Sequence, residues 1–86
     1  MPRLSQFYGI AVYMYYRDHA PPHCHAIYGE HEALYEIARG ACLMGQLPRR
    51  ARTLVEEWIA LHRAELMNDW NLAQTGQPLL PIDPLP

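Results

Sequence analysis

Lysine is absent from the sequence: all seven basic residues are arginines, and the formal net charge is −2 at pH 7. Proteins that bind nucleic acids are usually basic, so this bulk charge disfavours a general nucleic-acid binder. Arginines gathered at one place would still be able to hold a phosphate or a carboxylate in a bidentate manner. A nucleic-acid role therefore depends on local clustering of the arginines.

Cysteine and long hydrophobic runs are also scarce. The chain has two cysteines, Cys24 and Cys42, and its N-terminus lacks the apolar segment of a secretory signal peptide. No run approaches the roughly 18 apolar residues of a membrane span. We therefore expect a cytoplasmic protein with reduced thiols and no membrane association, in which both cysteines are small core residues of strands.

The chain is rich in apolar and aromatic residues, since half of its 86 residues are hydrophobic and six are tyrosines. This composition excludes a disordered chain and fits one domain. Its core must be thin, because a chain of this length buries only about 60–65% of its unfolded surface. Proline gathers near the C-terminus, so we expect one domain over residues 1–77 and a proline-rich tail over residues 78–86. The tail is expected to pack on the body, to bind another protein or to fray.

The first half of the chain has the β-branched and aromatic residues of strands. Residues 7–16 are apolar on both faces, which favours a central strand or one covered by a partner chain. Arg39 and Gly40 are expected to form a tight two-residue turn before the last strand. The predicted fold class is α+β, with an antiparallel β-meander of three to four strands over residues 7–16, 23–28, 33–38 and 41–46.

Residues 48–73 have helical spacing, with Pro48 suited to the first turn and Gly76 to the end. One straight helix would be about 40 Å long, whereas a domain of this size is about 30 Å across. We therefore predict two C-terminal helices packed on one sheet face, with a break near residues 62–64. The alternative is one long kinked helix whose overhang packs on a partner. The predicted core stripes are Ala51, Leu54, Val55, Trp58 and Leu61, then Leu66, Trp70 and Ala73.

Four of the five histidines lie within residues 18–32. His23 and His25 are two apart on a predicted strand, so both rings project from one face and Cys24 projects from the other. Such a pair can chelate a divalent metal such as zinc, with Asp18 or His19 as a third ligand from the loop. We therefore take His23, His25 and Asp18 as candidate metal ligands and expect no other cofactor.

The same histidines allow two other interpretations. They could satisfy backbone groups around the double-proline turn. They could also act as the acid and the base of a metal-independent ribonuclease, with arginine binding the phosphate. His23, His25 and Asp18 are thus also the candidate catalytic residues, and whether the protein is an enzyme stays open.

Arg49, Arg50 and Arg52 fall in the first turn of the predicted helix. The helix N-terminus is already partly positive, so cations there are unfavourable unless something offsets them. An external anion, either a phosphate or an acidic patch on a partner, would do so. Plain solvation is the alternative. Carboxylates of the chain itself could also offset the arginine charges; the candidates are Glu30, Glu32, Glu36, Glu56 and Glu57.

Three segments carry a resemblance to a known family: FYGIAVYMYYRDHAPPHCHAIYGEHEA, LPRRARTLVEEWIALHRAEL and DWNLAQTGQPL. Together they resemble the bacterial family DUF4160, a domain of unknown function with a PPHxH motif. The resemblance covers nearly the whole chain; Cys24 and Asp69 depart from residues frequent in the family. It implies a small stand-alone protein, often encoded beside another small protein, which has prompted toxin–antitoxin and transcription-regulator labels. It implies no catalytic residues.

Three functional hypotheses follow. The first is a small interaction or regulatory module that acts with a partner protein in a toxin–antitoxin-like or transcription-regulating pair. The second is an RNA-binding or RNA-cleaving protein, which the acidic net charge disfavours. The third is a metal-binding protein centred on His23 and His25. We also expect a homodimer that buries Tyr13 or Tyr15, because one chain can cover only one sheet face. The RNA hypothesis uses His23, His25, Arg49, Arg50 and Arg52.

Overall fold

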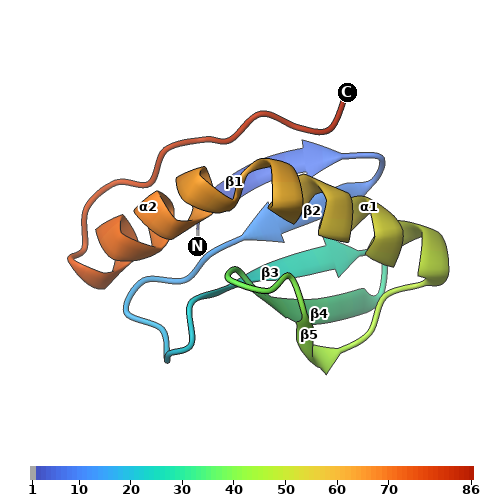
Figure 1. Ribbon diagram of the computed structural model, residues 1–86, viewed down its shortest axis with the longest axis horizontal. Coiled ribbons are helices and arrows are strands. Elements are labelled where there is room, and N and C mark those ends of the chain that lie inside the picture. Colours follow the sequence, from blue (N-terminus) through green and yellow to red (C-terminus); the bar gives the residue numbers. More distant parts are fainter. Residues whose placement is uncertain (1) are drawn as a thin grey trace.

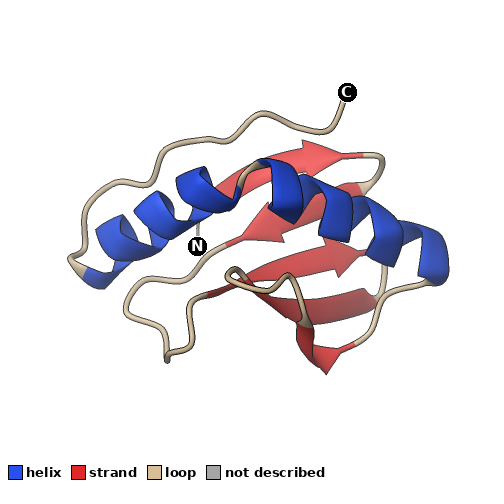
Figure 2. Ribbon diagram, viewed as in Figure 1, coloured by secondary structure: helices blue, strands red, loops and turns tan. Residues whose placement is uncertain are grey.

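Every strand of the sheet pairs with its neighbour in sequence, so the sheet is an antiparallel meander with the order β1-β2-β3-β4-β5. The computed structural model describes residues 2–86. The predicted α+β class is confirmed, although the sheet has five strands rather than three to four (Figures 1 and 2). The elements are β1 (Arg3–Phe7), β2 (Ile10–Tyr13), β3 (His23–Tyr28), β4 (His31–Glu36), β5 (Cys42–Gly45), α1 (Arg49–Leu61) and α2 (Arg63–Gln74).

The single strand predicted over residues 7–16 is wrong. Tyr8 and Gly9 both have positive φ values, 49° and 81°, and form the turn of a hairpin between β1 and β2. Two successive residues at positive φ match the right-handed twist of the strands that flank a two-residue turn. The chain therefore turns at Tyr8 and Gly9, inside the predicted strand. Residues 3–6, which were not predicted to be a strand, form most of β1.

Three smaller predictions also fail. The connection between β4 and β5 covers residues 37–41 rather than the expected two residues, and the Glu36 N–H donates across its base to the carbonyl oxygen of Ala41 at 2.8 Å. Cys24 is buried in the core, but Cys42 is exposed. Leu61, which was predicted to lie in the core stripe, is 64% exposed, whereas Ile59 is fully buried.

Both helices cover the same face of the sheet (Figure 1), as predicted. The break between them is at His62, whose N–H donates to the carbonyl oxygens of Trp58 and Ile59. The two-helix prediction is therefore confirmed, and the chain has no long-helix overhang. Neither helix within residues 2–86 has the length and apolar character needed to cross a membrane. The buried helix residues are Ala51, Val55, Trp58 and Ile59 in α1, and Leu66, Asp69, Trp70 and Ala73 in α2.

The proline-rich tail packs against the body. Its Ile82 N–H donates to the carbonyl oxygen of Leu4 at 2.8 Å, along the outer edge of β1. Trp58 Nε1 donates to the carbonyl oxygen of Asp83 at 2.8 Å. The chain therefore returns over its own first strand after α2 (Figure 1).

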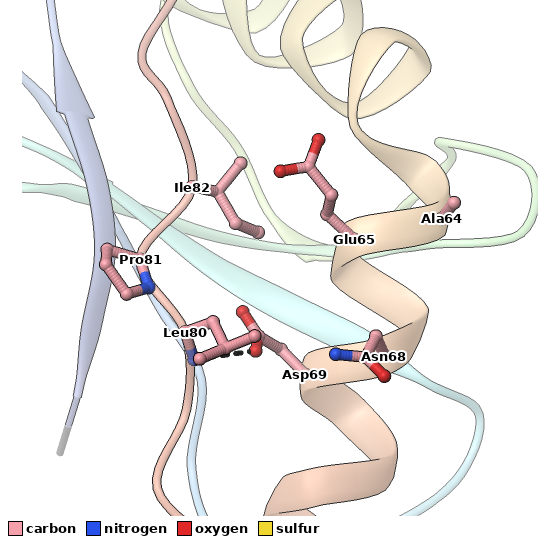
Figure 3. A pocket seen from close by; sticks show the side chains of 7 residues that line it. All are labelled: Ala64, Glu65, Asn68, Asp69, Leu80, Pro81 and Ile82. Atoms are coloured by element: carbon pink, nitrogen blue, oxygen red, sulfur yellow. Dashed lines mark hydrogen bonds between the residues drawn. The ribbon is translucent and has the colours of Figure 1, made fainter.

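A pocket of about 330 Å³ lies between α2 and the tail (Figure 3). The buried Asp69 side chain lines it and accepts a 2.9 Å hydrogen bond from the Leu80 N–H through Oδ1. Oδ2 of Asp69 has no hydrogen-bond partner among residues 2–86. Burial raises the pKa of Asp69, the Leu80 bond lowers it and nearby Glu65 raises it, so that the pKa lies above its usual value.

The face of the sheet opposite the helices carries a row of directly paired residues. Tyr13 pairs with His25, His25 with Leu34, and Leu34 with Met44. On the helix-covered face, Val12, Cys24 and Tyr35 are fully buried. The open face is therefore the one that carries the histidines of β3.

Candidate metal centre

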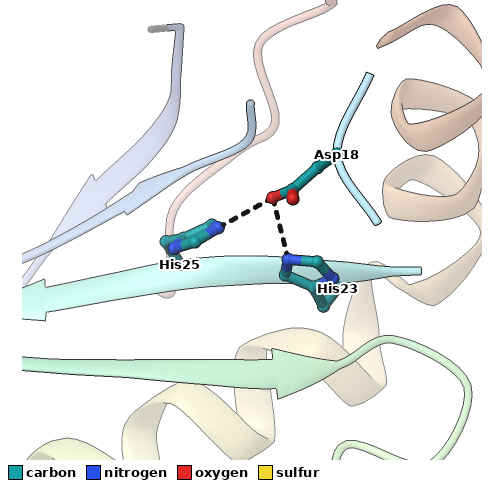
Figure 4. Close-up of side chains that lie close together, drawn as sticks. All are labelled: Asp18, His23 and His25. Atoms are coloured by element: carbon teal, nitrogen blue, oxygen red, sulfur yellow. Dashed lines mark hydrogen bonds and ion pairs between the residues drawn. The ribbon is translucent and has the colours of Figure 1, made fainter. Parts of the chain in front are cut away.

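His23 and His25 project from the open face near the start of β3, on the opposite side from buried Cys24. Both are nonetheless largely shielded from solvent, with 5% and 8% of their surface exposed. Part of the shielding comes from the segment between β2 and β3, whose Tyr15 packs against His25 and whose Asp18 lies beside both rings near the start of β3 (Figure 4). The predicted common orientation of the two rings is confirmed by the contacts described below.

Hydrogen bonds to α2 hold that segment in place. The N–H of Arg17, a residue with φ of 53°, donates to the carbonyl oxygen of Ala73 at 3.2 Å. Gln74 Nε2 donates to the carbonyl oxygen of Asp18 at 3.3 Å. The N–H of His19 donates to Asp18 Oδ1 at 2.8 Å. The Asp18 carboxylate is thus anchored through one oxygen, and its other oxygen faces the histidines.

Two imidazole nitrogens converge on that second oxygen (Figure 4). His23 Nε2 lies 3.0 Å from Asp18 Oδ2, and His25 Nε2 lies 3.2 Å from the same atom. One donor atom from each of the three residues lies within 4.8 Å of the other two. The three side chains therefore bring two nitrogens and one oxygen to a common point.

The outer nitrogen of each ring faces an acceptor. His23 Nδ1 is 2.8 Å from the carbonyl oxygen of Pro21, and His25 Nδ1 is 3.3 Å from Glu32 Oε2. A carbonyl oxygen can only accept, so His23 Nδ1 must carry a proton. In its neutral form His23 therefore directs the lone pair of Nε2 inward, toward Asp18.

Aromatic rings limit the movement of both imidazoles. Tyr15 packs edge-on to His25 with 4.3 Å between ring centroids, and Trp70 packs against His23 at 5.3 Å. These contacts fix the ring planes before any ligand arrives. Burial raises the pKa of Asp18, but the hydrogen bond from the His19 N–H, the hydrogen bond with His25 and the positive charge of His23 in its protonated form outweigh it, so that the pKa lies below its usual value.

Of the predicted ligand set, the structure brings together Asp18, His23 and His25. His19, the alternative third ligand, is exposed and contributes only its backbone N–H. Sequence reasoning missed Glu32 as a partner of His25 and considered it only as a counter-charge for the arginines. The link was hidden because Glu32 reaches His25 from a diagonal position across the β3–β4 pair, which depends on strand register.

The arginines form a separate surface. Arg49, Arg50 and Arg52 are all exposed, and no ion pair within residues 2–86 involves them. The first turn of α1 and the segment that carries Asp18 lie at opposite ends of the molecule (Figure 1). A single chain therefore does not combine these arginines with the two histidines in one site.

Comparison with known proteins gives one match. A family model described as "Domain of unknown function (DUF4160)" matches residues 9–71, which include β2 to β5, α1, most of α2 and all three converging side chains. No curated protein and no solved structure matches the chain. With a family model that spans most of its length, the chain belongs to the DUF4160 family.

Proposed function

We propose that the protein binds a divalent transition-metal ion, with zinc as the first candidate, through Asp18, His23 and His25. The observation that carries this proposal is the orientation of the two rings. Both Nε2 atoms converge on Asp18 Oδ2, while both Nδ1 atoms face acceptors. Histidines that ligate metals commonly donate their other N–H to a carbonyl or a carboxylate.

A cluster without metal explains the same geometry less well. Neutral His23 would aim a lone pair at an anionic oxygen, because its proton is on Nδ1. Protonating His23 alone would relieve this contact, but a neutral His25 would still aim a lone pair at either Asp18 or Glu32. Protonating both rings would place two imidazolium ions with 5.1 Å between ring centroids in a shielded site. A cation between the three donors satisfies both lone pairs and the carboxylate together.

The donor set and its spacing favour zinc. Tetrahedral zinc with ligand distances of about 2.0–2.1 Å separates its donors by about 3.3 Å. The two nitrogen–oxygen distances, 3.0 and 3.2 Å, are close to that value, and all three donor atoms lie within 4.8 Å of one another. Three protein ligands leave a coordination position for water or a small ligand, as in open zinc sites. Two histidines and one carboxylate also suit ferrous iron.

Calorimetric titration with zinc tests the proposal. We expect one ion per chain, with binding lost or weakened at least tenfold in His23→Ala, His25→Ala and Asp18→Asn. The matched control is His31→Ala, which removes an exposed histidine on β4. Absence of heat with the wild-type protein, for zinc and for ferrous iron alike, would contradict the proposal. Equal loss in the His31 variant would point to nonspecific binding.

The second candidate is an interaction module that acts in the cytoplasm with a partner protein, in a regulatory or toxin–antitoxin-like pair. It is supported by a groove of about 580 Å³ that is lined by exposed Tyr8 and Leu61 and by the charged residues Arg50 and Glu57. Exposed apolar residues beside one cation and one anion suit a partner segment that is apolar and carries charges of both signs. This surface lies on α1, the β1–β2 turn and the C-terminal tail, away from the candidate metal ligands.

Capture from host lysate with wild-type protein and the Arg50→Glu/Leu61→Glu variant tests this module, with Arg3→Glu as the charge control. A protein captured by the wild type and the control but not by the double variant would support it. Identical captured proteins in all three samples would contradict it. RNA binding through the arginines would instead give an affinity that falls with salt, with a log–log slope of about −0.7 per phosphate.

Assembly into a homodimer is a further part of this proposal. Tyr13 and Tyr15 are half-buried on or beside the open sheet face, so a second copy would bury them further. Light scattering at tens of micromolar should then report twice the mass of the chain, and Tyr13→Glu should restore the monomer. A monomeric wild-type protein would remove the dimer from the proposal.

A further inference from the structure

The candidate metal ligands form one wall of a pocket whose other wall is apolar. The pocket has a volume of about 340 Å³ and extends from the ligands to Leu34, Leu43 and Met44 on β4 and β5. This volume lies at the small end of the range for ligand sites. Space for a small molecule therefore exists beside the donors rather than at a distance from them.

The apolar wall includes large hydrophobic side chains that are exposed to solvent. Met44 is 66% exposed and Leu43 37% exposed, on a strand at the edge of the sheet. Leu34 pairs directly with both His25 and Met44, so the three lie side by side across β3, β4 and β5. A ligand bound at the donors can therefore bury its apolar body against Leu34 and Met44 without rearrangement of the strands.

The charges of the lining residues limit the chemistry of the ligand. No arginine lines the pocket, and Asp18 is its one carboxylate. A divalent ion together with ionised Asp18 carries a charge of +1 at the donors. Glu32 lies beyond His25 and is about half exposed, so solvent screens its charge, and a monoanion suits the donors better than a dianion. A phosphate dianion would leave an excess of negative charge without the arginines that usually bind it.

We infer that the pocket binds a small monocarboxylate with an apolar body, whose carboxylate completes the coordination of the metal and whose chain packs on Leu34 and Met44. This inference rests on the proposed metal site and names the class of ligand that the site takes. It also assigns a role to the exposed apolar residues of β5, which neither the fold nor the metal requires.

The experiment uses the whole chain loaded with Co²⁺, whose visible spectrum changes when a ligand enters its coordination sphere. Acetate and hexanoate are titrated in turn. Each buried methylene strengthens binding by about fourfold, so hexanoate should bind at least about tenfold more tightly than acetate. Hexylphosphonate at a pH where it is a dianion should bind more weakly than hexanoate.

Variants separate the pocket from the metal site. Met44→Gln keeps the length of the side chain but makes it polar, and should reduce the preference for hexanoate to about threefold or less while Co²⁺ affinity stays within twofold. Leu61→Gln, an exposed leucine on α1, is the matched control and should change neither value.

The outcomes distinguish the two proposals. Normal Co²⁺ binding with equal affinities for acetate and hexanoate would overturn the ligand assignment and leave the metal site standing. Tighter binding of hexylphosphonate than of hexanoate would also overturn it. Absence of Co²⁺ binding would overturn the metal site, and the ligand assignment with it.

Discussion

Glu32 approaches His25 from the neighbouring strand, with Glu32 Oε2 3.3 Å from His25 Nδ1. The two residues occupy diagonal positions of the β3–β4 pair, because Glu32 is paired with Ile27 and His25 with Leu34. The Glu32 side chain is about half exposed, whereas that of His25 is buried. The carboxylate therefore orients the ring from its solvent side and leaves Nε2 to face inward.

Replacing this carboxylate should weaken metal binding without removing a ligand. We expect Glu32→Gln to lower zinc affinity by about 10- to 100-fold, as loss of such supporting partners commonly does. Glu30→Gln, an exposed neighbour, is the matched control and should leave affinity unchanged. Calorimetric titration measures both. Equal affinities for the two variants would show that Glu32 has no part in the site.

The two cysteines should differ sharply in reactivity. Burial raises the pKa of the Cys24 thiol to about 12, whereas Cys42 is exposed on β5. Because the thiolate is the reactive species, a thiol reagent at neutral pH should modify one cysteine per native chain and two in denaturant. Mass spectrometry would place the native modification on Cys42. Rapid modification of Cys24 would contradict its burial in the core.

Asp69 should make stability depend on pH in the opposite sense from a paired carboxylate. Because its pKa is raised in the folded protein, its contribution to stability is full below the unfolded pKa of about 4 and is lost as pH rises through the folded pKa. The free energy of unfolding of wild type relative to Asp69→Asn should therefore fall as pH rises above about 4. The fall amounts to about 1.4 kcal/mol per unit of pKa shift.

Urea titrations at several pH values measure this difference. Asp83→Asn removes a carboxylate from the exposed part of the tail and serves as the control. A difference between wild type and Asp69→Asn that rises with pH would mean that the Asp69 carboxylate is stabilised by a partner in solution.

Gly45 should tolerate no side chain. Its φ is +72°, and a Cβ atom there would lie 2.1 Å from the carbonyl oxygen of Glu32. Gly45→Ala should therefore lower stability by more than the roughly 1–3 kcal/mol of backbone strain alone. Gly29→Ala is the control, because Gly29 has a φ of +58° but nothing within 4 Å of the added Cβ. Thermal unfolding compares the two, and equal melting temperatures would contradict the predicted clash.

Periodicity predicted the helices well because both bury a continuous stripe on one face. The break at His62 followed from helix length and from the polar residues that a single register would have placed in the core. The first strand failed because the turn at Tyr8 and Gly9 lies inside an aromatic run that has the composition of a strand. Composition reports which residues suit a strand but not where the chain reverses.

The candidate site was predictable in part for a similar reason. The two-residue spacing of His23 and His25 determines their common face, whatever the rest of the fold. Asp18 joins them only because hydrogen bonds to α2 direct the loop over β3, and Glu32 joins only through strand register. Contacts of this kind depend on tertiary structure, which local patterns do not encode.

The hydrogen bond between Ile82 and Leu4 has a consequence for the order of synthesis. Residues 77–86 leave the ribosome after both the sheet and the helices, yet they cover the outer edge of the first strand. Until they emerge, the nascent domain presents an open strand edge of the kind that pairs with other chains. Docking of residues 77–86 is therefore also the step that removes this route to aggregation.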